Sequence, residues 1–426
     1  MAEQIERYLE TAGAQVRWRR VRPALERELR THLEEQTEAY LAEGMTEDAA
    51  EAEAVRQMGD AETVGLALDA VHRPKKQTAI LLFAGLAIVL GMYLRTEWIG
   101  SSLAFALASG VLACGALFGG YYLDYRRLSR YAWYIYGAVF VLGAICVYQT
   151  TFMGPGAPRM LGITVGDTSE YAALLYPAAY ALAVYALRGK KGGFWLSLAA
   201  LAPFALPFLW DRYVGILPQL LFAVCAAAVL LSAIRAGLFQ VKKNCARALV
   251  WALLVLAVVG IFYQDAQRYQ NFSDWYFSPA GLREWREILR EYWKNSSTAS
   301  ALLTRGTLAE ANRLGTLSGA PAWLWLAALY TPQIVLLVIL LVRTAKLKNP
   351  LGRMLCMPTG VVLSLRLVLG LLYQAGIFPL FMPLPFISGN LYTVMDAALL
   401  GLALSTLRQS ACPEAAPRSK QPDPAV

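Results

Sequence analysis

The chain has 426 residues, of which 57% are hydrophobic, and a mean hydropathy of +0.42. This apolar share exceeds that of soluble globular domains and predicts a membrane protein. The formal net charge is +9, and because the Lys and Arg residues gather in loops between apolar segments, we do not expect a nucleic-acid partner. The six cysteines show no CxxC spacing, so the sequence predicts no disulfide framework or Cys-ligated metal.

Residues 1–76 are polar and acidic, with apolar residues at helical spacing. The first two predicted helices each have an apolar face. Gly44 is expected to end the second helix and Thr46 to cap the third. Gly59 and Asp60 are expected to separate the third helix from a short last one. The pattern predicts a small cytoplasmic helical domain. The residues expected on the two apolar faces are Ile5, Tyr8 and Leu9, and then Leu25, Leu29, Leu33, Tyr40 and Leu41.

The order of these signals resembles a small helical prefix domain that precedes some bacterial permeases and membrane-signalling proteins. The resemblance implies an interaction module without chemistry of its own. It rests on Glu28, Leu29, His32, Gly44, Met45, Thr46, Glu47, Ala50, Met58, Gly59 and Asp60.

From residue 77 to residue 410 the chain carries apolar runs long enough to cross a bilayer. Backbone polar groups must be paired within each run in lipid, so these runs are expected to be helices. The fold class is therefore all-α, a polytopic bundle of about ten transmembrane helices. The predicted spans are 78–94, 100–122, 131–150, 170–187, 194–210, 213–234, 247–263, 322–342, 354–375 and 390–407.

Alternate short loops are basic, and this pattern predicts the orientation. The loops between them carry few or no basic residues. We therefore expect a multi-pass protein of the cell membrane, with the basic loops and both termini on the cytoplasmic side. The long connection 264–321 is then external, and residues 411–426 form a disordered cytoplasmic tail. The basic loops are 124–130, 188–193, 235–247 and 343–353.

Three stretches of the membrane domain resemble motifs of the SEDS family, which includes FtsW, RodA and SpoVE. Arg159, Ser169 and Glu170 match the first motif, with Met160 where tryptophan is usual. Asp211 falls on the aspartate of the second motif. "LPFIS" at 384–388 matches the start of the third, after which Gly389 and Asn390 replace its glycine-rich continuation. The resemblance implies peptidoglycan assembly in cell shape, division or sporulation, with a lipid-linked precursor as ligand.

The resemblance also implies where the precursor binds and which residue performs catalysis. In the family an aspartate at the entry to the eighth span acts in glycan polymerisation, but "SGAPAWLWLAALYT" at 318–331 has no acid, and Leu326 stands near the expected position. We therefore expect impaired catalysis, with Glu310 and Glu170 as the alternative acids. The predicted substrate-binding residues are Arg159, Glu170, Asp211, Arg212, Pro385, Ser388, Gly389 and Asn390.

Several functions stay open at this point. The protein is expected to bind a precursor or a partner such as a penicillin-binding protein, yet an active lipid II polymerase, a flippase or transporter, and a signalling scaffold also fit. No cofactor is expected, and a divalent metal enters only if the protein is catalytic. Asp396 in the last span is expected to face the bundle, with Arg366 in the ninth span as its partner.

Overall fold

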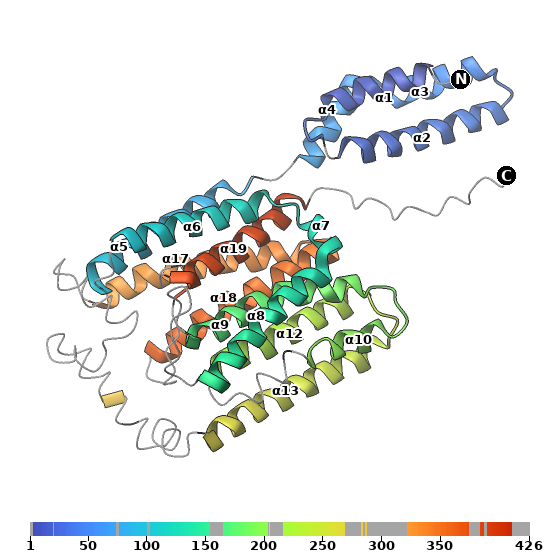
Figure 1. Ribbon diagram of the computed structural model, residues 1–426. Helices are drawn as coiled ribbons and strands as arrows, with labels where there is room; N and C mark the ends of the chain where they lie inside the picture. The colour runs from blue at the N-terminus through green and yellow to red at the C-terminus, as the bar shows by residue number, and fades with distance from the viewer. Residues whose placement is uncertain are drawn as a thin grey trace. The chain divides into compact units, whose positions relative to one another are not determined.

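The computed structural model describes residues 3–19, 21–73, 76–99, 103–153, 165–202, 204, 216–268, 283, 286–287, 322–374, 384–386 and 390–410. Every regular element in this described part is a helix, as predicted (Figure 1). The chain divides into two compact units, unit 1 with Met1–Lys76 and Arg408–Val426, and unit 2 with Gln77–Leu407. The predicted tail at 411–426 lies outside the described residues.

Unit 1 contains the helices α1 (Glu3–Gln15), α2 (Arg22–Ala42), α3 (Glu47–Met58) and α4 (Ala61–His72). The helix boundaries follow the predicted signals: Gly59 ends α3 at a φ of 88°, and the Asp60 carboxylate accepts a hydrogen bond from the Thr63 N–H at 2.9 Å. Apolar side chains of the first three helices form the core of this unit. The buried ones include Ile5, Tyr8, Leu9, Leu25 and Leu33.

The prediction is wrong for one residue of this core. Leu41 is 41% exposed, whereas its neighbour Tyr40 packs against the core. Tyr40 follows Leu33 by seven residues and so continues the apolar face of α2, while each further residue turns the helix by about 100°. That turn directs Leu41 away from the core.

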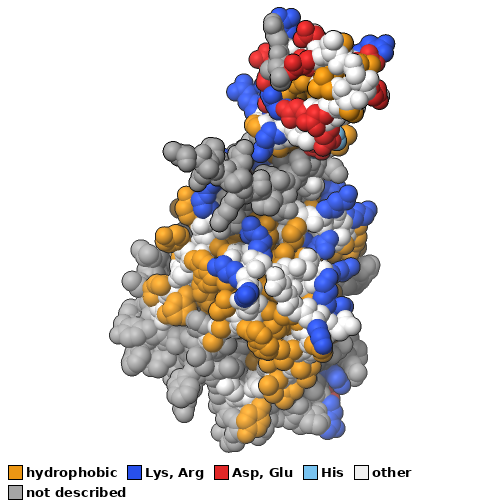
Figure 2. Space-filling model, turned by 90° about the vertical axis from the view of Figure 1, so that its right-hand side faces the viewer, with side chains coloured by type: hydrophobic (Ala, Val, Ile, Leu, Met, Phe, Trp, Pro, Cys, Tyr) orange, Lys and Arg blue, Asp and Glu red, His pale blue; other side chains and the backbone are white. Residues whose placement is uncertain are grey.

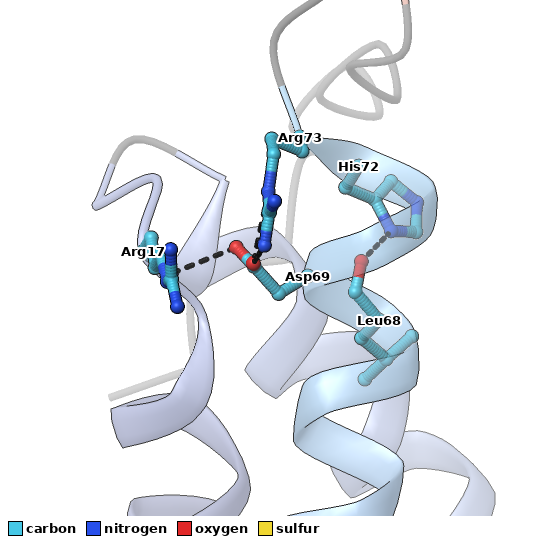
Figure 3. A network of polar contacts seen from close by, with 5 residues as sticks. All are labelled: Arg17, Leu68, Asp69, His72 and Arg73. Carbon is cyan, nitrogen blue, oxygen red and sulfur yellow. Dashed lines mark hydrogen bonds and ion pairs between the residues drawn. The ribbon is translucent and has the colours of Figure 1, made fainter.

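A buried carboxylate joins the ends of two helices of unit 1 (Figure 3). The Asp69 side chain is 2% exposed; its Oδ1 accepts the N–H of Arg17 at 3.0 Å and its Oδ2 accepts Nη2 of Arg73 at 2.6 Å. These hydrogen bonds hold the pKa of Asp69 below its usual value, and the bond from Arg73 has the largest effect. Burial alone would raise this pKa. Because Arg17 follows α1 and Arg73 follows α4, Asp69 fixes both helix ends.

Unit 2 holds the remaining helices, and the predicted spans fall on them with one exception. Of the span predicted at 194–210, the structure describes the short helix α10 and residues 200–202 and 204, and the remainder lies outside the described residues. The helix α13 continues to Arg268, so the long external loop predicted from residue 264 begins later than expected. The helices are α5 (Thr78–Ile99), α6 (Leu103–Tyr122), α7 (Tyr125–Leu128), the short 3₁₀ helix η1 (Ser129–Tyr131), α8 (Ala132–Met153), α9 (Val165–Ala186), α10 (Gly193–Ala199), α12 (Ile216–Arg235), α13 (Lys243–Arg268), α17 (Ala322–Ala345), α18 (Pro350–Gln374) and α19 (Asn390–Arg408).

Several of these helices have the length and apolar composition of membrane spans. Within the described residues, 5 segments are long and apolar enough to cross a bilayer, and further apolar helices are shorter. Helices of this kind satisfy their own backbone groups in lipid, so the chain is a polytopic helical membrane protein. The 5 segments are Tyr125–Ile145, Pro218–Arg235, Lys243–Gln264, Ala327–Ala345 and Pro350–Leu372.

The basic loops lie at one end of unit 2. The N–H of Gly189 donates to the carbonyl of Leu238 at 3.2 Å, which joins the loop after α9 to the loop after α12. A Cβ atom on Gly352, early in α18, would lie 3.6 Å from the hydroxyl of Tyr125. Lys and Arg side chains are spread over the face of unit 2 seen in Figure 2. The side of the membrane that this end faces stays a prediction.

Helices α6 and α19 touch at a pair of glycines. A Cβ atom on Gly401 would lie 2.4 Å from the carbonyl oxygen of Leu117, and one on Gly120 would lie 2.9 Å from the amide nitrogen of Leu402. Both distances are too short for a side chain, so this close backbone contact requires glycine at both positions. Around it, one buried apolar cluster joins α5, α6, α17, α18 and α19.

The Asp69 contacts lead to a testable expectation. Asp69→Asn should destabilise unit 1 by about 2 kcal/mol at pH 7, because the charged acceptor of two hydrogen bonds is lost. The folded pKa lies below the ordinary value of 3.8, so the stabilisation is complete above that value and is lost as the pH falls through the lower, folded pKa. Hydrogen-exchange protection of α1 and α4 in the full-length protein measures the effect at pH 7 and pH 3.

The matched control is Glu34→Gln, which makes the same carboxylate-to-amide change at an exposed position of α2. It should leave protection unchanged at both pH values. Equal protection in Asp69→Asn and the wild-type protein at pH 7 would contradict the role given to Asp69.

Candidate functional site

The connection before α19 enters the core of unit 2 at residues 384–386, here called the 384–386 turn. Leu384, Pro385 and Phe386 are buried, and Phe386 is 1% exposed. Phe386 has a φ of 65°, in the left-handed region that a bulky residue adopts only under constraint. Its N–H donates to Oδ2 of Asp396 at 3.1 Å. The Asp396 carboxylate thus holds a strained turn in place.

The same carboxylate pairs with Arg366 of α18. Nη1 of Arg366 donates to Oδ1 of Asp396, and the two side chains are 2% and 0% exposed. The guanidinium carbon also lies 5.9 Å from the centroid of the Tyr392 ring. Burial of a charge in a membrane bundle is costly unless the charge is paired, and this pair confirms the partner predicted for Asp396. One carboxylate therefore connects α18, α19 and the 384–386 turn.

Most of the predicted binding and catalytic residues lie outside what the structure describes. Pro385 lies in the buried turn, and Asn390 is the first residue of α19. Glu170 lies in the first turns of α9, but neither its side chain nor that of Asn390 is described. The other predicted residues fall outside the described ranges. They are Arg159, Asp211, Arg212, Glu310, Ser388 and Gly389.

A separate apolar cavity of about 350 Å³ lies between α10, α12 and α13. Its lining side chains are almost all aliphatic or aromatic; Gln219 is the polar exception among those described. This volume is in the range of small-molecule pockets, and an apolar lining suits a hydrocarbon chain. Leu198, Phe222, Ala226, Leu254, Ala257 and Ile261 are among the lining residues.

Helix α12 separates this cavity from the buried ion pair. Phe222 and Ala226 line the cavity, whereas Leu221 and Cys225 pack in a cluster with α18 and α19. Neighbouring residues of a helix point in different directions, so the two sites share one helix and use opposite faces of it. Gln219 and Ile261 place one end of the cavity near the start of α12, away from the basic loops.

The acid that the structure describes beside the 384–386 turn already has partners. Asp396 is already held by Arg366 and by the N–H of Phe386. Helix α17, which contains Leu326, has no acidic residue in its first turn. Glycosyl transfer needs a base for the attacking hydroxyl, and within the described residues neither Asp396 nor the first turn of α17 offers an acid without a partner.

Two features of the site escape sequence reasoning. The left-handed backbone of Phe386 has no sequence signal, because phenylalanine has no preference for that conformation. The cavity depends on how three helices pack, and its lining residues read as ordinary apolar span residues. The acid in the last span was a usable signal, because an intramembrane carboxylate calls for a partner.

No protein-family model and no curated protein matches this chain. Its fold is similar to that of a chain in a peptidoglycan synthase complex, whose structure was described as the structural coordination of polymerization and crosslinking. The TM-score is 0.56 and the sequence identity is 18%, and the match covers 78% of this chain and 97% of that chain. The rod shape determining protein RodA of Thermus thermophilus is similar at a TM-score of 0.48 and 16% identity, over 79% of this chain and 97% of RodA. The first likeness confirms the expected fold.

The buried ion pair can be tested by single and double substitution. Asp396→Ala should cost about 3–5 kcal/mol of stability, because it leaves the Arg366 charge buried without its partner. The double variant Arg366→Met with Asp396→Leu should lose much less, since both charges are removed together. Thermal unfolding in detergent, followed by tryptophan fluorescence, measures both, and a double variant as unstable as the single one would argue against the pair.

Proposed function

We propose that this chain is a divergent SEDS-type protein of bacterial peptidoglycan assembly that binds a lipid-linked cell-wall precursor without polymerising it. The observation that carries the proposal is the fold shared with a chain of a peptidoglycan synthase complex, over 97% of that chain. The motif resemblance at 384–388 also supports it, and the described part of this stretch forms the buried 384–386 turn.

The apolar cavity is the proposed site of the precursor's lipid tail. It lies between α12 and α13, and α13 carries large exposed apolar side chains, including Trp251, Val255 and Leu256. Such a face suits contact with lipid, so a hydrocarbon chain could enter the cavity from the bilayer. A tail that enters from the bilayer is already out of water, so van der Waals packing against the lining residues, rather than the hydrophobic effect, would hold it there.

The headgroup is proposed to lie at the end of the bundle where α18 ends and α19 begins. The 384–386 turn, fixed by Asp396, leads there into residues 387–389 and α19. Arg159 and Arg212 are the proposed cations for the pyrophosphate, and Ser388, Gly389 and Asn390 would supply polar groups from the loop. In this proposal the end with the basic loops faces the cytoplasm, as do both termini.

The missing base decides between binding and catalysis. No acid occurs in residues 318–331, and Leu326 cannot accept a proton. The proposed role is therefore to hold a precursor, or to support a partner synthase such as a penicillin-binding protein, which would perform the chemistry. The likeness to a chain of a synthase complex fits such a partner.

Tail binding can be tested by filling the cavity. Ala257→Trp places an indole among the lining residues and should weaken lipid II binding in nanodiscs by about tenfold or more. The control is Ala252→Trp, the same change on the same helix at an exposed position outside the lining. Microscale thermophoresis with labelled lipid II gives both affinities, and equal weakening by the two variants would remove the cavity from the proposal.

The absence of catalysis has its own test. Wild-type protein in proteoliposomes with lipid II should bind the precursor and form no glycan chains. Glu310→Ala and Glu170→Ala should behave in the same way. Glycan chains made by the wild-type protein and lost in either variant would instead identify an active polymerase that uses that acid.

A further inference from the structure

Gln333 and Thr393 are among the buried polar side chains of unit 2 that have no hydrogen-bond partner within the described residues. Gln333 of α17 is 3% exposed and Thr393 of α19 is 5% exposed. In the part of the chain that the structure describes, neither amide atom of Gln333 nor the hydroxyl of Thr393 makes a hydrogen bond. Buried polar groups in proteins are nearly always paired, and leaving one unpaired is costly, above all within a membrane bundle. These side chains therefore call for a polar partner.

Both side chains point toward the same core. Gln333 precedes Leu336 and Leu340 on α17 by three and seven residues, and Thr393 precedes Ala397 and Leu400 on α19 by four and seven. These four apolar residues belong to one buried cluster, which also contains Phe386. Residues at such spacings share a helix face. Gln333 and Thr393 therefore continue two facing apolar stripes by one helical turn.

The two side chains also lie at the same level of the bundle. A Cβ on Gly360 of α18 would lie 2.8 Å from the side chain of Leu341, so the antiparallel neighbours α17 and α18 are level at these residues. Eight residues further along, Gln333 is level with position 368 of α18. The Arg366–Asp396 pair sets the register of the antiparallel helices α18 and α19. Two residues further along α18, position 368 is level with position 394 of α19, the residue after Thr393.

This position adjoins the proposed headgroup site. Thr393 lies in the first turn of α19 and one turn before Asp396, which holds the 384–386 turn. The unpaired groups are a carboxamide and a hydroxyl, both neutral, and each can donate and accept hydrogen bonds. A secondary amide or a hydroxyl can also donate and accept, so it satisfies both sides of these groups, whereas an ionised phosphate has no donor for the Gln333 carbonyl oxygen.

We propose that Gln333 and Thr393 form a polar subsite that takes an amide or hydroxyl group of the precursor's headgroup. This inference rests on the proposed function, because the headgroup of a lipid-linked cell-wall precursor carries N-acetyl sugars and a stem peptide. Both parts contain secondary amides, and the sugars add hydroxyls.

The test replaces each side chain by an apolar one of similar shape. Gln333→Leu and Thr393→Val should not lower the melting temperature, because they remove buried polar atoms that have no partner in the protein. Each should weaken lipid II binding in nanodiscs by about tenfold. Binding of undecaprenyl pyrophosphate, which has the same tail and no sugar or peptide, should stay at the wild-type level.

Thr359→Val provides the matched control. Thr359 is 2% exposed, but its hydroxyl already donates to the carbonyl of Leu355 at 3.2 Å within α18. This variant should bind both lipids as the wild-type protein does. A precursor that lacks the stem peptide separates the two sources of the amide. If Gln333→Leu still binds this precursor more weakly than the wild-type protein does, the amide belongs to the sugars. If the two proteins bind it equally, the amide belongs to the peptide.

Three results would overturn the inference. If Gln333→Leu and Thr393→Val bind lipid II as tightly as the wild-type protein, the subsite does not contact the headgroup. If both lipids are weakened equally, the substitutions act on the tail or on the fold. If the wild-type protein binds neither lipid, the proposed function fails together with the inference.

Discussion

The carboxylate of Asp396 is the contact on which the arrangement of the candidate site depends. It neutralises Arg366, which would otherwise leave a cation buried among apolar helices, and it accepts the N–H of Phe386 in a left-handed backbone. Such a backbone costs on the order of 1–3 kcal/mol. A hydrogen bond to a charged acceptor is stronger than a neutral one and offsets that cost. The turn, the end of α18 and the start of α19 are thus placed by a single side chain.

Helix α12 carries this arrangement to the other half of unit 2. Leu221 and Cys225 pack with α18 and α19, and on the opposite side Phe222 and Ala226 line the apolar cavity. A ligand with a long apolar tail and a polar head needs two unlike environments within reach of each other. In the proposal, the cavity beside α12 takes the tail, and the loop before α19, which the ion pair holds in place, takes the head.

Sequence reasoning gave reliable results where one physical rule acts alone. The length of apolar runs predicted the helices of unit 2, because lipid leaves no alternative to a helix, and Asp60 and Gly59 marked helix ends in unit 1 by their local chemistry. It failed where side chains depend on packing. Leu41 turned outward, and Gln333 in an apolar span gave no sign that its amide lacks a partner. The predicted binding residues outside the described ranges stay predictions.

The glycine contact between α6 and α19 limits which sequences can share this fold. Gly120 and Gly401 have no room for a Cβ atom, so a descendant chain can change one of them only by moving two helices apart. Exposed apolar positions such as Val255 and Leu256 on α13 face no such limit and are free to exchange among aliphatic residues. Two diverging lineages would therefore lose most of their sequence identity on the lipid-facing helices long before this seam changes. A chain that keeps this contact between its second and last spans is therefore expected to keep a small residue at both positions.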